Sequence, residues 1–209
     1  MRLYLSSYRV GAHADRLLAL SFGQRTALIP NALDGLPADV RDAGLQRDIA
    51  DLGQLGLEVT ELDLRDANAA ERLSGFDIVW VRGGNTFVLR RVLADTGTDR
   101  ALTDLIQRDA LLYAGYSAGA CVLAPDLSGL EAVDDIAAVA NPVTTGLGWL
   151  DRPFVPHVHS PGHPETVACD AVAARYEAVG QAHWALGDGD VLIIDGDTTE
   201  LLRSDSLKP

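Results

Sequence analysis

Residues 111–120 read LLYAGYSAGA, an uncharged run that passes into a Gly-x-Ser-x-Gly motif centred on Ser117. A run of this kind is typical of a strand buried on both faces of a sheet. A helix is predicted to begin after Ser117, so the chain turns sharply from strand to helix at the serine. Such a turn lifts one hydroxyl out of the backbone, beside the free N–H groups of a helix N-terminus. Ser117 is therefore a candidate nucleophile, and the alternative is a serine that caps a tight turn.

Apolar runs and helical patterns alternate on the N-terminal side of this stretch. Strands are predicted at residues 3–5, 26–29, 57–64, 76–81 and 111–116, and helices at 37–55, 67–73, 87–93 and 98–108. The alternation predicts βαβ units, and hence an α/β fold with an open, mostly parallel sheet and helices on both faces.

The rhythm changes after Pro125. Loops and short strands are predicted up to residue 156, with one short strand at 154–158 and a helix at 165–179. Residues 190–202 predict a C-terminal hairpin with its turn at 195–197. Because no linker, repeat or low-complexity segment interrupts the pattern, we interpret residues 1–209 as a single domain.

Composition narrows the class of protein. Hydrophobic residues make up 47% of the chain, and 17 Lys and Arg against 30 Asp and Glu give a net charge of −13. Such an acidic surface repels phosphate backbones and anionic lipids, so neither nucleic-acid binding nor membrane binding is expected. The N-terminus lacks the pattern of a signal peptide, and the uncharged run 110–125 is too short to span a bilayer. With two cysteines and no CxxC pattern, the expected location is the reducing cytoplasm.

A glycine pair follows the predicted buried strand 76–81, in the sequence Gly83-Gly84-Asn85-Thr86-Phe87. The carboxyl ends of the strands are where open α/β sheets bind ligands. The loop could therefore supply a backbone N–H donor for an oxyanion. The alternative is an ordinary strand-to-helix loop that Asn85 caps.

A serine nucleophile needs a base, and three of the five histidines lie close together, at His157, His159 and His163. Along the predicted strand 154–158, His157 and His159 share a face, so the spacing leaves the choice between them open. The spacing H-x-H-x₃-H lacks the HExxH helix pattern and a nearby cysteine, and so no metal site is expected.

The motifs GGNTF, GYSAGA and a later Pro-His, in this order, resemble the peptidase E and cyanophycinase family of serine peptidases. The resemblance runs from about residue 3 to residue 194. It implies a class I glutamine-amidotransferase-like, flavodoxin-like α/β fold and a Ser-His-acid hydrolase without metal or organic cofactor. Ser117 matches the nucleophile and His157 the base. Gly84 and Ala118 match the oxyanion donors.

The resemblance leaves the acid open. Asp134 and Asp135 lie in the loop region where the family often places it. Asp188 matches a family position that carries a glutamate near the site. An acid bonded to the base fixes its tautomer and stabilises the imidazolium. The three aspartates therefore stay as alternatives.

The sequence departs from the aspartyl dipeptidases of this family, which carry an arginine in a GETRE-like helix start. Val167 stands at that position, so strict specificity for Asp-X peptides is not expected. Arg82 could substitute for the missing arginine, and Asn85 and Thr86 are further candidates for substrate binding.

The resulting hypothesis is a serine peptidase that hydrolyses short peptides, dipeptides above all. An α/β-hydrolase-type esterase and an inactive amidotransferase-like binding domain are the alternatives. The expected partner is a small peptide substrate, and a homodimer stays open.

Overall fold

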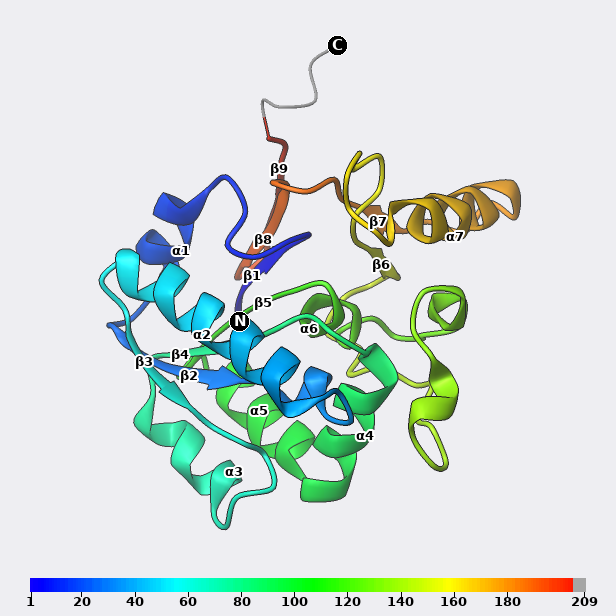
Figure 1. Ribbon diagram of the computed structural model, residues 1–209. Helices are drawn as coiled ribbons and strands as arrows, with labels where there is room; N and C mark the ends of the chain where they lie inside the picture. Colours follow the sequence, from blue (N-terminus) through cyan, green and yellow to red (C-terminus); the bar gives the residue numbers. More distant parts are fainter. Residues whose placement is uncertain (205–209) are drawn as a thin grey trace.

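The computed structural model describes residues 1–204 and is built around a seven-stranded sheet (Figure 1). The strand order is β3-β2-β4-β5-β1-β8-β9. The strands are β1 (Arg2–Ser6), β2 (Arg25–Ile29), β3 (Glu58–Glu61), β4 (Ile78–Val81), β5 (Leu112–Tyr116), β8 (Val191–Asp195) and β9 (Thr198–Leu202). Strands β1 to β5 are parallel to one another, whereas β8 and β9 form a hairpin at one edge, in which β8 pairs antiparallel with β1. The predicted open, mostly parallel sheet and its C-terminal hairpin are confirmed.

Alternation of side chains along the central strands divides the core into two layers. In β1, Leu3 and Leu5 join one buried cluster and Tyr4 joins the other. The Tyr4 side is covered by α1 (Ala14–Leu20) and α2 (Ala38–Gln54). The opposite side is covered by α3 (Ala69–Arg72), α4 (Thr86–Thr96) and α5 (Thr98–Gln107) (Figure 1). Helices therefore lie on both faces, as predicted.

Several elements differ from their predicted bounds. The sequence pattern did not predict α1, whose seven residues bury only Leu17 and Leu20. The strand predicted at 57–64 is shorter in the structure. Only Glu58–Glu61 pair with β2, at the exposed edge of the sheet, and these residues form β3. The helix after Ser117 is the single turn α6 (Ala118–Cys121). No helix within residues 1–204 combines the length and apolar character needed to cross a membrane.

The C-terminal third adds a small second sheet beside the first. It contains β6 (Phe154–Val155) paired with β7 (Trp184–Ala185), and α7 (Thr166–Ala178) projects beyond it (Figure 1). The strand predicted at 154–158 ends early, since Pro156 has no N–H to donate and His157 takes a positive φ of 57°. Short 3₁₀ turns complete the elements: η1 (Asn31–Leu33), η2 (Leu73–Gly75), η3 (Leu130–Ala132) and η4 (Ile136–Ala138).

Three neighbouring parallel strands, β4, β5 and β1, end at the same edge of the sheet. Val81 lies opposite Gly115, and Ser6 lies opposite Tyr116. The segments that leave these strands begin at Arg82, Ser117 and Ser7, and the shared register brings them side by side.

Candidate active site

Ser117 occupies the turn between β5 and α6 in a strained backbone conformation. Its φ of 48° and ψ of −118° lie in a region that residues with a side chain rarely adopt. The Ser117 carbonyl accepts hydrogen bonds from the N–H groups of Ala120 and Cys121, both at 2.8 Å. Its N–H donates to the Ser6 carbonyl at 3.4 Å. The surrounding backbone thus holds a partly exposed serine in the geometry of a nucleophile elbow.

The glycines of the motif allow the turn to press against β4. A Cβ on Gly115 would come within 2.5 Å of the Val81 carbonyl oxygen, and one on Gly119 would overlap the same atom. A Cβ on Gly83 would lie 3.0 Å from the Cβ of Ser117. The glycine loop after β4 therefore contacts the serine directly, and no larger residue would permit that approach.

The two N–H groups expected at an oxyanion hole are free. Among residues 1–204, neither the Gly84 nor the Ala118 N–H donates a hydrogen bond. Gly84 has a φ of 148°, and a Cβ there would collide with the backbone of Ala32. Ala118 is the first residue of α6, where an N–H has no partner within the helix.

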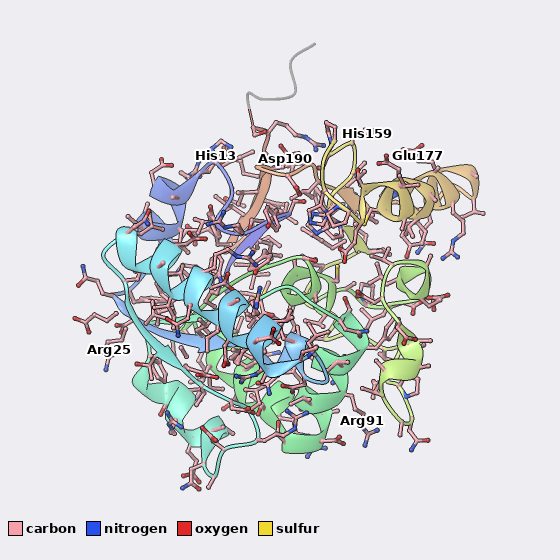
Figure 2. All side chains as sticks on the ribbon, viewed as in Figure 1. His13, Arg25, Arg91, His159, Glu177 and Asp190 are labelled. Carbon is pink, nitrogen blue, oxygen red and sulfur yellow. The ribbon has the colours of Figure 1, made fainter. Side chains whose placement is uncertain are left out.

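His157 lies buried in the loop that follows β6. Its side chain is 2% exposed, and its Nδ1 lies 2.7 Å from Oδ1 of Asp188. Its carbonyl accepts a hydrogen bond from Oγ1 of Thr166, at the start of α7. His159 lies at the outer surface instead, 81% exposed (Figure 2). The strand alternation that left the two histidines equivalent ends before Pro156. The His157 side chain is therefore buried and the His159 side chain is exposed.

Of the three candidate acids, Asp188 is the one on the His157 ring. It lies after β7, and its N–H donates to Oγ of Ser160 at 2.8 Å. Burial by itself would raise the pKa of Asp188. The hydrogen bonds from His157 and Ser7 and the charge of His157 outweigh burial, and the pKa is lowered below its ordinary value. The carboxylate is thus held in its charged form beside the imidazole.

The other two aspartates have different partners. Asp135 is exposed, and its carboxylate accepts from the Ala137 N–H as the cap of η4. Asp134 is partly buried and accepts from the Thr86 N–H at 2.9 Å. Burial raises the pKa of Asp134 to about 6, although the two hydrogen bonds from Thr86 oppose the shift. Neither carboxylate shares a hydrogen bond with His157, so the geometry does not support Asp135 as the orienting acid.

Ser6 and Ser7 connect the serine to the histidine. The Ser6 carbonyl accepts from the Ser117 N–H, and Oγ of Ser7 accepts from the His157 N–H at 2.8 Å. The same Ser7 hydroxyl donates to Asp188 Oδ1 at 3.0 Å. Sequence reasoning missed these two serines. Their place directly after the strand that neighbours β5 is the signal that could have identified them.

Sequence reasoning also missed Tyr8, whose ring packs against Tyr116, His157 and His163. Its centroid lies 6.2 Å from that of Tyr116, 5.9 Å from that of His157 and 5.2 Å from that of His163. The ring is edge-on to all three. Tyr8 therefore fills the space between the residue that precedes Ser117 and the two histidines.

The candidate substrate residues after β4 are occupied by structural contacts. Asn85 caps α4, with Oδ1 accepting from the N–H groups of Phe87 and Val88, and its Nδ2 donates to the Asp135 carbonyl. Thr86 is buried. Asn85 is therefore the cap of α4, while the Gly84 N–H of the same loop donates no hydrogen bond within residues 1–204.

Arg82 lies beneath α2 rather than beside the serine. Its side chain is 4% exposed and pairs with Asp48 at 3.2 Å. It also donates to the Tyr116 hydroxyl at 2.9 Å. Burial, the largest effect, raises the pKa of Tyr116 to about 12, so the hydroxyl keeps its proton. The guanidinium thus fixes the side chain of Tyr116, the residue before Ser117, through its hydroxyl. It is not positioned to replace a substrate clamp.

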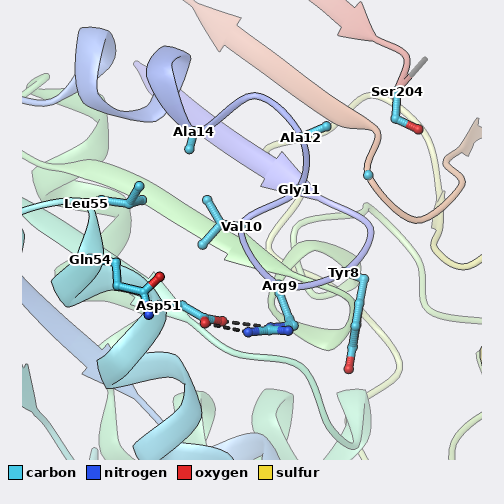
Figure 3. A pocket seen from close by; sticks show the side chains of 11 residues that line it. Tyr8, Arg9, Val10, Gly11, Ala12, Ala14, Asp51, Gln54, Leu55 and Ser204 are labelled. Atoms are coloured by element: carbon cyan, nitrogen blue, oxygen red, sulfur yellow. Dashed lines mark hydrogen bonds and ion pairs between the residues drawn. The ribbon is translucent and has the colours of Figure 1, made fainter. Parts of the chain in front are cut away.

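A cavity of about 470 Å³ has Tyr8 in its lining (Figure 3). It is lined by the segment 8–12 and by residues of α2, and Arg9 Nε donates to Asp51 at 2.7 Å across it. Ser117 and His157 do not line it. The residues singled out for chemistry therefore lie outside this cavity.

A family model and several relatives match this chain. The model of peptidase family S51 matches residues 12–202. An uncharacterized peptidase of Listeria monocytogenes is 33% identical over 113 residues, which cover 52% of this chain and 55% of the relative. Peptidase E of Streptomyces coelicolor is 33% identical over 145 residues, which cover 68% of this chain and 54% of the relative. The chain thus spans about half the length of these curated relatives.

Two solved structures share the fold. A peptidase E candidate from Listeria monocytogenes superposes with a TM-score of 0.83 at 23% identity, covering 98% of both chains. A peptidase from an acI-B1 Actinobacterium superposes with a TM-score of 0.71 at 16% identity, covering 97% of this chain and 87% of that one. At these identities the likeness concerns the fold.

Proposed function

Because the chain belongs to peptidase family S51, a family of serine peptidases, we propose that it hydrolyses short peptides, dipeptides above all. Ser117 is the nucleophile, His157 the general base and Asp188 the acid that orients it. Gly84 and Ala118 supply the oxyanion hole.

One observation carries the assignment. Strained Ser117 and the buried histidine of the histidine–aspartate pair both hydrogen-bond to two adjacent residues of the chain. The Ser117 N–H donates to the Ser6 carbonyl, and the His157 N–H donates to Oγ of Ser7. Strain at a residue that could otherwise relax is typical of a site where the side chain must be presented for chemistry. The aspartate on Nδ1 leaves Nε2 of His157 as the nitrogen that can accept a proton.

The reaction proceeds in two steps, acylation of Ser117 and hydrolysis of the acyl-enzyme. Nε2 of His157 takes the Ser117 proton while Oγ bonds to the scissile carbonyl carbon, and the carbonyl oxygen becomes an oxyanion held by the Gly84 and Ala118 N–H groups. The C–N bond then breaks, and the imidazolium returns its proton to the leaving amine. Water repeats the sequence on the acyl-enzyme, which releases the acid product and restores the serine.

Two features favour neutral over acidic residues at the N-terminal position of the substrate. Val167 is 78% exposed at the start of α7, where the resemblance places the arginine of aspartyl dipeptidases. Arg82, the candidate replacement, is buried against Asp48. A substrate carboxylate would therefore find no cationic partner at either position.

The esterase alternative is disfavoured by chain order. In α/β-hydrolases the acid precedes the histidine in the chain. Here the aspartate on the imidazole follows it, 31 residues later. The inactive-domain alternative is disfavoured by the charge state of Asp188 and by the retained elbow.

The test is a panel of dipeptides and p-nitrophenyl esters combined with labelling by a fluorophosphonate. We expect dipeptide turnover and stoichiometric modification of Ser117, located by peptide mass spectrometry. Hydrolysis confined to esters would support the esterase. Absence of both turnover and label would support the inactive domain.

A further inference from the structure

Three side chains with metal-ligating atoms converge in the loop that leads into α7. They are His157, His163 and Glu165, and one ligand atom of each lies within 4.8 Å of the other two. Within residues 1–204 no other group of three histidine, cysteine or acidic residues meets this condition. The spacing of His157, His159 and His163 did not predict this set, because the structure turns His159 outward and brings in Glu165.

His157 has the environment of a metal-binding histidine. Metal-ligating imidazoles usually donate their second N–H to a carboxylate, which fixes the tautomer and raises the basicity of the ligating nitrogen. Nδ1 of His157 lies 2.7 Å from Asp188, and the ring is nearly inaccessible to solvent. Nε2 points to the opposite side, 3.8 Å from Oε2 of Glu165. The arrangement that suits a general base therefore also suits a zinc ligand.

The other two ligands need only small movements. The ring centroids of His157 and His163 lie 3.6 Å apart with 7° between their planes, so the nitrogen lone pairs of the two rings lie in nearly parallel planes. Donors on a tetrahedral Zn²⁺ lie about 3.3 Å apart with converging lone pairs. His163 is partly exposed and its Nδ1 accepts one long hydrogen bond, 3.3 Å from the Glu165 N–H. A turn of this ring toward a shared ion would break that one hydrogen bond and change its stacking on His157.

The ligand types select the class of cation. Two imidazoles and one carboxylate suit zinc and its neighbours among the divalent transition metals. Magnesium and calcium prefer sites made of oxygen ligands. Three protein ligands leave a coordination position for water.

We propose that His157, His163 and Glu165 form a binding site for Zn²⁺, and that the bound ion inhibits the enzyme by occupying Nε2 of His157. An imidazole nitrogen bound to a metal has no lone pair left to accept the serine proton. The binding half of this inference stands on the ligand geometry alone, whereas the inhibition half rests on the proposed function.

Binding is measured by calorimetric titration of Zn²⁺ into the Ser117→Ala protein, freed of any histidine tag, so that no catalysis is involved. We expect one ion per chain, and no heat from Mg²⁺ at the same concentrations. Adding His163→Ala or Glu165→Gln should weaken zinc binding at least tenfold, as judged on variants that retain the parental Tm. The matched control His159→Ala should change the affinity less than twofold, because that ring lies outside the cluster. Absence of stoichiometric binding, or an equal loss in His159→Ala, would overturn the site.

Inhibition is measured on the wild-type chain with the preferred dipeptide. Turnover should fall with a midpoint that matches the calorimetric dissociation constant, and a chelator should restore it. Zinc that binds to the cluster while turnover is unaffected would overturn the inhibition. A chain that binds zinc but cleaves no peptide would instead contradict the proposed function and leave the site standing.

Discussion

Oγ of Ser7 lies 3.0 Å from Oδ1 of Asp188 and donates its proton to that carboxylate. The same oxygen accepts the His157 N–H at 2.8 Å, so one buried hydroxyl fixes the backbone of the histidine and the side chain of its acid together. Ser7 follows Ser6, whose carbonyl holds the Ser117 N–H. The first loop of the chain thus aligns residues that lie far apart in the sequence.

Ser7→Ala should therefore impair catalysis more than its stability loss explains. We expect kcat to fall roughly 10- to 100-fold, since a small misplacement of a catalytic group is costly. Stability should fall by about 1–3 kcal/mol, because buried polar partners lose a hydrogen bond. Thr26→Ala is the matched control: it removes a buried hydroxyl that donates to the Gln24 carbonyl at the start of β2, away from His157 and Asp188. Equal loss of kcat in both variants would contradict a positioning role for Ser7.

Asp188→Asn should reduce kcat by on the order of 10³- to 10⁴-fold, because an amide favours the wrong histidine tautomer. Asp135→Asn should leave kcat within about threefold, since the Asp135 carboxylate caps η4 and is exposed. The two variants are compared by steady-state kinetics on one dipeptide. A large effect at Asp135 with a small one at Asp188 would reverse the assignment of the acid.

Asp134 gives a prediction about pH. Its pKa is raised to about 6 in the folded chain, against 3.8 for the free side chain, so folding favours the protonated form. Stability from this group is present at low pH and is lost as the pH rises through that range. Asp134→Asn should therefore be more stable than wild type by on the order of 1–2 kcal/mol at pH 8 and gain much less at pH 5. Urea unfolding at the two values measures the difference; a gain independent of pH would contradict the raised pKa.

Gly119→Ala should destabilise the fold by about 2 kcal/mol or more, because the added methyl would overlap the Val81 carbonyl at the elbow. Gly53→Ala is the control in α2, where an added Cβ meets nothing within 4 Å. That change should stabilise by about 0.5–1 kcal/mol through helix propensity. Chemical denaturation of both proteins gives the comparison. Similar effects of the two substitutions would show that close packing against β4 is not required.

Substrate preference should reflect the absence of an arginine at position 167, where this chain has Val167. Asp-Leu should be cleaved no better than Ala-Leu or Leu-Leu by wild type, and Val167→Arg should raise kcat/KM for Asp-Leu about tenfold, roughly 1.4 kcal/mol. Val167 is exposed, so an arginine fits there without disturbing the core. A tenfold preference of the wild type for Asp-Leu would contradict the inference from Val167.

The sheet and the elbow could be predicted from local patterns. The uncharged run before Ser117 and the glycines around it specify a strand, a sharp turn and a helix within a dozen residues. The choice of histidine could not be made this way, because it depends on the end of β6 before Pro156 and on the positive φ of His157. The family resemblance, rather than periodicity, favoured that residue.

The candidate acid and the residues that support the site could be identified only from the tertiary structure. Asp188 and His157 meet through two loops, and no local periodicity links them. Arg82 could be read as a substrate residue because the sequence does not reveal its ion pair with Asp48 of α2. Ser7 and Tyr8 follow an ordinary strand and carry no motif, so only the neighbouring position of β1 and β5 gives them a role.

The most direct test of Ser117 as the nucleophile is the turnover of a dipeptide by Ser117→Ala beside wild type, with both proteins checked for the same Tm. We predict a fall in kcat of about 10⁴-fold or more, to the level left by substrate binding and the oxyanion hole alone, because this role requires the Ser117 hydroxyl. A Ser117→Ala protein that keeps its fold and cleaves the dipeptide at close to the wild-type rate would contradict it.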